Sequence, residues 1–573
     1  MTRYDGAGGT AFTGPRNSRD PKSVTGESQL PAGRLVNGTV PTMLRARLPC
    51  VIAIGVAAMA CEAAPGTLHR RRDPGALIVA QPLDVTGLDP VRVIDSESLE
   101  VGGILFEGLA RLRPGTTDIE PGLATAWKVS PDGLRWTFTL RPGVVFHDGT
   151  PLDADAVVFS FERLLVRRNP HYLGGDDAVY WRGMLRDIKR VHAPDPSTVV
   201  IEVDRPYAPL LGALAILPIV SPTAVRRWGN DFPRHPAGTG AFAFESWDPG
   251  EQVVVRRFAR YWGPPPQFER IVFRVVEDAR QRLVDLQSGS VDLTMSILVD
   301  EQAFVELHPN LQLHHAPSNN IVYLAINLDH AAFRDLRVRR AISHAINKEP
   351  IIKLAYQGRA IAADSVLPPG QWGNHVPAQR YGYDLVHARR LIDEATAAHA
   401  FDPTRIYRLY APSTPRSYIA VPEQIARYLQ ATLAQIGVRI ELVLQPNATY
   451  LASVSRGDHD LALAGWTGDI GDPDNFLYVL LHSDNAISGS AQNISFYRNR
   501  EVDHLLTAAQ AAIDRAARSA IYAEVQELIA EDAPWVPLAH TELVVASRAE
   551  IDHVVLSPLG HLLYTLIRRK ESP

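Results

Sequence analysis

Strand-like and helix-like apolar patterns are mixed along the chain from Ala76 onward, with no internal repeat and no long linker. The run "ALIVAQ" predicts a short strand, and "VSPDGLRWTFTL" predicts a hairpin that turns at residues 131–133. In "VPEQIARYLQATLAQIGVRIELVL", a helical pattern ends near Gly437, a predicted C′ residue, and runs directly into a strand. This mixture of elements predicts an α/β or α+β protein with several sub-domains.

Two further segments predict particular local structures. The segment "TPLDADAVVFSFERLL" predicts a helix with Thr150 as N-cap, Pro151 at the first helical position and Asp153 in the first turn. The segment "DLRVRRAISHAINKEPIIKLAY" is also helical in pattern. On the second strand of the hairpin, apolar residues alternate on one face: Leu134, Trp136, Phe138 and Leu140.

Length, charge and cysteine content limit the classes of protein that this chain can form. Its 573 residues supply core for about two to four domains. A net charge of −5 argues against nucleic acid as a partner, because phosphate binding needs concentrated Lys and Arg. The two cysteines are Cys50 and Cys61, so no disulfide can form in the rest of the chain.

The N-terminal region indicates export. Residues 1–42 are rich in Gly, Pro, Ser, Thr and Arg and predict either a disordered extension or a segment upstream of the true start at Met43. The following "MLRARLPCVIAIGVAAMAC" has a basic start, an apolar run and small residues before a cleavage point, which predicts a signal peptide over 43–60. The apolar run is about half the length that a membrane-spanning helix needs.

The end of this segment resembles the lipobox of bacterial lipoproteins. That resemblance implies that Cys61 is acylated, becomes the new N-terminus and anchors the protein to the membrane, with residues 61–75 as a tether. The position three before the cysteine is Ala58, where the family usually has Leu. Ordinary secretion therefore stays open as an alternative, since Ala58 and Ala60 also suit a standard signal peptidase.

Sequence motifs for catalysis are absent from the chain. The Gly-x-Ser-x-Gly, His-Glu-x-x-His and P-loop patterns do not occur. His147 and Asp148 are adjacent in "FHDGTP", which an Asp-Gly turn explains. We therefore predict no catalytic residues, no metal site and no cofactor, with an extracellular hydrolase as the disfavoured alternative.

The stretch "GWTGDIGDPDNF" follows an apolar run, Leu461 to Ala464, that predicts a buried strand. Three aspartates stand close together in it: Asp469, Asp472 and Asp474. A calcium loop is disfavoured because the alternating ligands and the later Glu are missing. A solvent-facing turn is the plain interpretation. Trp466 favours a third one, a carboxylate beside an aromatic ring that binds a ligand ammonium.

Six segments, in order, make the chain resemble the periplasmic peptide-binding proteins of ABC importers, the dipeptide and oligopeptide receptors of family 5. These segments are "LFEGLARLRPG", "PGLATAWKVSPDGLRWTFTLRPGVVFHDGTPLDADAVVFSFERLL", "AGTGAFAFESWDPGEQVVVRRFARYW", "LQSGSVDL", "FRDLRVRRAISHAINKEPII" and "GWTGDIGDPDNF". The resemblance extends from Leu88 to about Leu563. One departure is Phe258, where the family usually carries Asn.

Within that family, "GWTGDIGDPDNF" is most similar to the dipeptide-binding branch. The resemblance implies that Asp469 pairs with the α-ammonium of a ligand and that Arg416 binds its α-carboxylate, with Tyr418 lining the same pocket. It also implies that an extended peptide lies between two protein segments. Those segments are Glu107-Gly108-Leu109 and Gly465-Trp466-Thr467, with Gly468 completing the loop before Asp469.

The implied fold is α/β, of the two-lobed type II, cluster C-like kind, with an extra small domain inserted early. We expect one lobe from residues 78–115, 195–312 and 540–573, the small domain from 116–194 and the second lobe from 313–539. The implied function is an extracytoplasmic receptor, monomeric, that delivers short peptides to membrane permease subunits with cytoplasmic ATPases. Relatives that carry haem, nickel complexes, sugars or opines keep another cargo open.

Overall fold

The computed structural model describes residues 73–175, 177–295 and 297–570. The expected N-terminal extension, the signal peptide and Cys61 lie outside the described residues. Within those ranges, no helix is both long enough and apolar enough to cross a bilayer.

Twelve strands form one mixed sheet. They are β1 (Ala76–Gln81), β8 (Phe242–Asp248), β9 (Gln252–Arg257), β10 (Arg270–Val275), β11 (Leu293–Thr294), β12 (Leu311–Pro317), β13 (Asn320–Ile326), β14 (Ala360–Ala362), β15 (Ile406–Pro412), β16 (Arg439–Gln445), β17 (Leu461–Thr467) and β18 (Trp535–Arg548). Their order is β16-β15-β17-β13-β18-β11-β1-β10-β9-β8, and β12 and β14 also pair with β18.

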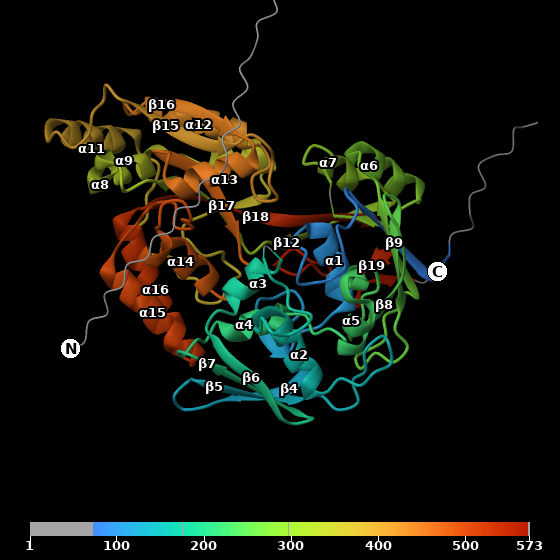
Figure 1. Ribbon diagram of the computed structural model, residues 1–573. Coiled ribbons are helices and arrows are strands. Elements are labelled where there is room, and N and C mark those ends of the chain that lie inside the picture. The colour runs from blue at the N-terminus through green and yellow to red at the C-terminus, as the bar shows by residue number, and fades with distance from the viewer. Residues whose placement is uncertain (1–72, 176, 296, 571–573) are drawn as a thin grey trace, which may run out of the picture. The chain divides into compact units, whose positions relative to one another are not determined.

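The long strand β18 belongs to both halves of this sheet (Figure 1). Its first residues pair with β13, and residues 542–548 pair with β12. The residues of β13 are all buried, which explains the near-continuous apolar run "NIVYLAI". The strands predicted over 76–81 and from Leu461 are present as β1 and β17.

A second, four-stranded sheet has the order β4-β5-β7-β6. Its strands are β4 (Ala124–Val129), β5 (Arg135–Leu140), β6 (Ile188–Asp195) and β7 (Thr198–Val203). The predicted hairpin is confirmed, because β4 and β5 pair across the turn at 131–133. Trp136, Phe138 and Leu140 are buried, as the alternation predicts, and pack in one apolar cluster with residues of helix α2 (Ala154–Leu165).

The predicted N-cap of α2 is wrong. The helix begins at Ala154, and the Asp153 carboxylate accepts a hydrogen bond from the Ala156 amide at 2.9 Å. Thr150 instead donates its amide and hydroxyl to Asp148 in the preceding turn. Pro151 pairs with Val145 in an isolated bridge, so the chain is still extended there. The Asp-Gly turn engages Thr150 and leaves Asp153 to cap the helix.

The other helices that matter below surround the two sheets. They are α3 (Val179–Met184), α4 (Leu210–Ile216), α8 (Ala331–Arg334), α9 (Leu336–Ala345), α10 (Lys348–Tyr356), α12 (Pro422–Ala434), α14 (Asp474–Leu481), α15 (Arg500–Ala511) and α16 (Arg515–Asp532). The single helical pattern over 335–356 forms two helices, because Asn347 caps α10. After α12, Gly437 has a φ of +87°, two residues past the C-cap Gln435, and the chain enters β16 as predicted.

Candidate ligand site at the end of strand β17

The edge of β17 is only partly paired. Residues 465–467, predicted to bind a peptide backbone, pair with residues 320–322 of β13. On the opposite edge, β15 pairs with β17 only through Leu461 and Ala462. The last residues of β17 therefore face no other strand on that edge among the described residues. An unpaired edge of this kind can receive an extended peptide through backbone hydrogen bonds.

Asp469 lies just beyond this edge, in a loop that the side chain of Asn475 organises. The side-chain oxygen of Asn475, Oδ1, accepts hydrogen bonds from the Asp469 amide at 2.9 Å and from the Trp466 indole at 3.0 Å. Asn475 stands in the first turn of α14, so the helix holds the aspartate and the tryptophan at fixed positions. This role of Asn475 is not visible in the sequence, although the residue lies within "GWTGDIGDPDNF".

The Asp469 carboxylate faces Tyr180 of helix α3. Burial raises the pKa of Asp469 to about 6, and polar interactions with the Tyr180 hydroxyl and the Asn475 side chain oppose the shift only in part. Burial and the neighbouring carboxylate raise the pKa of Tyr180, so its hydroxyl stays protonated and can donate to Asp469. No sequence signal connected Tyr180 to this loop.

The other two aspartates of the motif are structural. Asp472 is buried and forms a bidentate pair with Arg518, at 2.7 and 2.8 Å. Asp474 is buried beside it and accepts hydrogen bonds from Gln510 at 3.0 and 3.2 Å. Burial, and then the neighbouring Asp472, raise the pKa of Asp474 to about 7. In the described part of the chain, no three acidic, His or Cys residues are grouped as a metal would need.

Two glycines of the motif are required by close contacts. A side chain at Gly468 would collide with the Asn319 amide and the Phe476 ring. The Gly468 amide also donates to the Asn319 carbonyl at 2.8 Å. A side chain at Gly465 would collide with the ring of Tyr418. The structure thus brings Tyr418 directly against β17, next to the residues of the motif.

Arg416 lies in the loop between β15 and α12, two residues before Tyr418. Its backbone exchanges hydrogen bonds with Ile419 at 2.9 and 3.1 Å, which fixes the turn. The side chain is exposed and forms no hydrogen bond or ion pair with another described residue. The guanidinium is therefore available to an anion, and its contact with a ligand carboxylate stays a prediction.

The segment Glu107-Gly108-Leu109 follows helix α1 (Ser96–Leu105). Its three carbonyl groups accept hydrogen bonds within the protein, from the amides of Ile219, Leu123 and Ala124. The Glu107 carboxylate points inward and accepts from three side chains: Thr239 at 2.8 Å, Tyr261 at 3.1 Å and Trp262 at 2.8 Å. Burial raises the pKa of Glu107 despite these donors.

Helix α4 connects this segment with the Asp469 loop. A side chain at Gly108 would collide with carbonyl oxygens at the end of α4, at 3.0 Å or less. On α4 itself, a side chain at Gly212 would come within 2.8 Å of the Ile470 carbonyl. Gly108 therefore contacts the end of α4, and Ile470, the residue after Asp469, contacts the same helix at Gly212.

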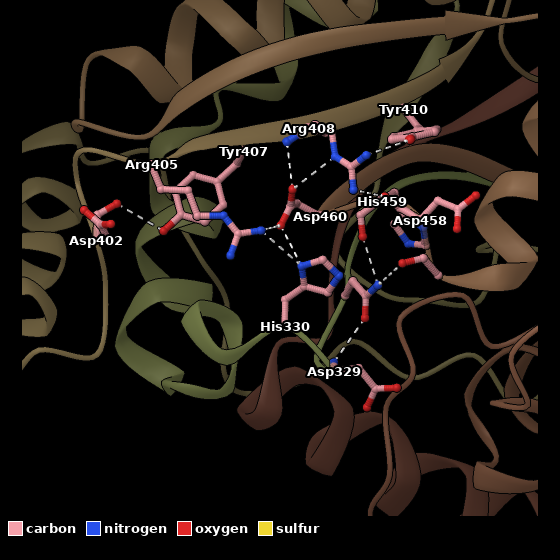
Figure 2. A network of polar contacts seen from close by, with 12 residues as sticks. Asp329, His330, Asp402, Arg405, Tyr407, Arg408, Tyr410, Asp458, His459 and Asp460 are labelled. Atoms are coloured by element: carbon pink, nitrogen blue, oxygen red, sulfur yellow. Dashed lines mark hydrogen bonds and ion pairs between the residues drawn. The ribbon is translucent and has the colours of Figure 1, made fainter.

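Two histidines each contact a residue type that occurs in catalytic sets, an aspartate in one case and a serine in the other. His330 and Asp460 approach to 2.7 Å, but Asp460 also binds Arg405 at 2.6 Å and the Arg408 amide at 2.9 Å (Figure 2). This network ties the start of β17 to β15 and α8. His314 and the Ser547 hydroxyl approach to 2.8 Å between β12 and β18. Ser547 is fully buried, so no substrate reaches it.

Comparisons with known proteins show the family to which the chain is similar. Residues 118–488 match the family described as "Bacterial extracellular solute-binding proteins, family 5 Middle". The chain is 32% identical to the dipeptide-binding protein of Escherichia coli K12 over 475 residues, which cover 80% of this chain and 87% of that protein. It is also 32% identical to the heme-binding protein A of Haemophilus influenzae over 493 residues, covering 83% and 89% of the two chains.

A solved structure is similar over most of both chains. This is an ABC transporter-associated periplasmic binding protein from Helicobacter pylori in complex with the peptide STSA. The TM-score is 0.71 and the identity 32%, with 87% of this chain and 98% of that chain covered. The likeness confirms the predicted two-lobed α/β fold.

Proposed function

Because the chain belongs to family 5 of the bacterial extracellular solute-binding proteins, we propose that it is the receptor of an ABC importer for short peptides. In this proposal it works outside the cytoplasm, captures dipeptides or somewhat longer peptides and delivers them to membrane permease subunits. The observation that carries the proposal is Asp469, a partly buried carboxylate with a raised pKa beside the unpaired edge of β17.

A peptide fits this arrangement in charge and in hydrogen bonding. Its α-ammonium pairs with Asp469, and the phenol of Tyr180, 40% exposed, offers a second polar contact at the same point. Its backbone extends along residues 465–467 by strand addition. Its α-carboxylate binds the unpaired side chain of Arg416, and the ring of Tyr418 closes the pocket beside Gly465. Leu109 is buried and takes no part in this contact, which leaves Glu107, the partly exposed residue of its segment, on the opposite side.

The domain division is also a proposal. Strands β1, β8, β9, β10 and β11 and the second half of β18 support one lobe, and β13 with β15–β17 supports the other. The separate four-stranded sheet supports the inserted small domain. Because β7 belongs to that sheet, we place the end of the small domain after β7 rather than at residue 194.

We further propose that the receptor is monomeric and anchored through an acylated Cys61. No cofactor enters this function, and membership of a solute-binding family favours a receptor over a hydrolase. A second cargo, haem, is favoured by one observation, the identity with a heme-binding relative over most of both chains.

One experiment separates these functions. The purified protein is incubated with a mixture of dipeptides to tetrapeptides with free ends, and the retained ligands are identified by mass spectrometry. Intact retained peptides are expected, with Asp469→Asn as the control that loses them. Shortened peptides would indicate a hydrolase. Saturable binding of hemin, seen as a shifted absorption band, without any peptide retention would replace the peptide proposal with haem.

A further inference from the structure

The side chain of Gln510 on α15 bonds two parts of the molecule at once. Its amide nitrogen donates to both oxygens of Asp474 on α14, at 3.0 and 3.2 Å. Its amide oxygen accepts from the guanidinium of Arg205 at 3.0 Å. Its backbone carbonyl accepts from the Ala208 amide at 2.7 Å. With 1% of its surface exposed, Gln510 makes these contacts out of reach of solvent.

The Asp474 end of these contacts leads to the ligand site. Asp474 is followed by Asn475, which holds the Asp469 amide and the Trp466 indole. The Arg205 end leads to the segment 205–208, which connects β7 to α4. Helix α4 in turn packs against the Ile470 carbonyl, next to Asp469. Gln510 therefore stands between the loop that carries the ligand carboxylate and the segment that carries α4.

We propose that Gln510 is a positioning residue for ligand binding, which holds the segment 205–208 against α14 and so keeps the Asp469 loop in its binding arrangement. This inference depends on the proposed function, because it takes Asp469 as the ligand contact. We name the four residues Gln510, Asp474, Arg205 and Ala208 the Gln510 clasp.

The physical basis is the two-ended chemistry of an amide. A glutamine donates to the anion on one side and accepts from the cation on the other. Separating the segment 205–208 from α15 would leave the buried amide oxygen of Gln510 without its partner, which is unfavourable. The intact clasp raises the fraction of molecules that can bind, and the apparent affinity follows that fraction.

The same chemistry supplies a sharp test. Gln510→Glu keeps the shape and the bond to Arg205, but its ionised form cannot donate to Asp474 and repels it. At lower pH the two carboxyls hold one proton between them and the bond returns, so binding is measured well above pH 7. We expect roughly tenfold to hundredfold weaker binding of the dipeptide Ala-Phe, measured by calorimetry, from the loss of a hydrogen bond to a charged group. Combining Gln510→Glu with Asp474→Asn exchanges donor and acceptor, and should restore the affinity to within about threefold of wild type.

The matched control is Gln430→Glu. Gln430 donates its side-chain amide to the Ile440 carbonyl at 2.9 Å, within one half of the sheet and away from the clasp. This variant should bind the dipeptide as wild type does. A double variant no better than Gln510→Glu alone would overturn the proposal, as would unchanged affinity in Gln510→Glu.

A second readout needs no ligand. Replacing Cys50 and Cys61 with serine leaves no thiol in the chain, so labels can be placed at Lys128→Cys in β4 and Glu501→Cys in α15, both exposed. The distance between labels should lengthen in Gln510→Glu and return in the double variant. Lower thermal stability with unchanged distances would mean a merely structural residue and overturn the proposal. If wild type binds no peptide, the proposed function fails, and these distances still decide whether the clasp exists.

Discussion

At the scale of single residues, three aspartates within six positions have three different environments. Asp469 has no cationic partner among the described residues and faces Tyr180. Asp472 is neutralised by Arg518, and Asp474 is buried beside it and bonded to an amide. Because burial without a cation is costly for a carboxylate, Asp469 gains the most from an incoming ammonium. The chemistry of the site therefore depends on neighbours, not on residue type.

The first prediction removes the Asp469 charge. Leaving the partner ammonium buried and unpaired costs ~3–5 kcal/mol, so Asp469→Ala should weaken peptide binding by roughly two to three orders of magnitude. Asp469→Asn keeps the shape and should bind nearly as weakly. Calorimetry with free and N-acetylated dipeptides checks this, since acetylation removes the ammonium. Normal affinity for acetylated peptides would contradict the role of Asp469.

The second prediction concerns pH. The ligand ammonium binds the ionised carboxylate, and the pKa of Asp469 is raised to about 6. Affinity should therefore be full above pH 6 and fall about tenfold per pH unit below it. In the ligand-free protein, the stability that Asp469 contributes changes with pH in the opposite direction to the affinity. The raised pKa favours the protonated carboxyl in the folded state, so its contribution to stability is full near pH 4 and lost as pH rises through 6.

Binding titrations from pH 4.5 to 7.5, with urea unfolding over the same range, measure both effects. Asp469→Asn is the control for each, because it has no titrating group at this position. Its affinity should be low and flat between pH 5 and 7. A wild-type affinity that stays constant down to pH 5 would mean that Asp469 does not contact the ammonium.

At the scale of elements, one N-cap decides where α2 begins, and the end of one strand pairing decides where the edge of β17 is open. Thr150 and Asp153 are both acceptable N-caps by residue type. The turn bonds of Thr150 to Asp148 exclude it, and α2 begins at Ala154. Likewise β17 is an ordinary buried strand over its first residues, and its edge toward β15 is unpaired only beyond Ala462.

The third prediction compares these two residues as caps. Asp153→Ala should lower the free energy of unfolding by ~1 kcal/mol, because the Ala156 amide loses its acceptor. Thr150→Ala should cost less than about half of that, since it removes only a bond within an exposed turn. Urea denaturation of both variants provides the measurement. Equal losses would mean that Thr150 shares the capping role.

At the scale of the whole molecule, the two halves of the large sheet are joined by β18 and by the step from β12 to β13. We expect a receptor with such a connection to bind ligand by shifting an equilibrium between lobe arrangements. Ligand that contacts both sides supplies the differential free energy that this shift requires.

The fourth prediction follows from that equilibrium. Saturating dipeptide should reduce the radius of gyration of the wild-type protein in solution scattering. Asp469→Asn should show no change at the same peptide concentration, because it lacks the ammonium partner. A wild-type radius that stays constant under saturating ligand would argue against closure.

The fifth prediction concerns the anchor. If Cys61 is acylated, Cys61→Ala should release the protein from the membrane into the soluble or culture fraction. Two or more acyl groups are expected, since a single chain anchors only marginally. Fractionation followed by immunoblotting measures the release. A variant that stays with the membrane would rule out the lipid anchor at this residue.

The sequence by itself determined the fold class, the main strands and the family. These follow from periodicity and from local turn chemistry, which depend on residues close together in the chain. The hairpin at 131–133, the strands β1 and β17 and the helix ending before Gly437 all have local causes. The family resemblance, confirmed by the comparisons, likewise rests on short segments in a fixed order.

Only the tertiary structure decided which aspartate is available and what surrounds it. Tyr180, Gln510 and Arg518 reach the motif from distant parts of the chain, and no local pattern marks them. The cap of α2 was missed for a related reason, since bonds to Asp148 had already engaged Thr150. Burial, pairing and pKa depend on every group packed nearby, and such neighbours are known only when the chain is folded.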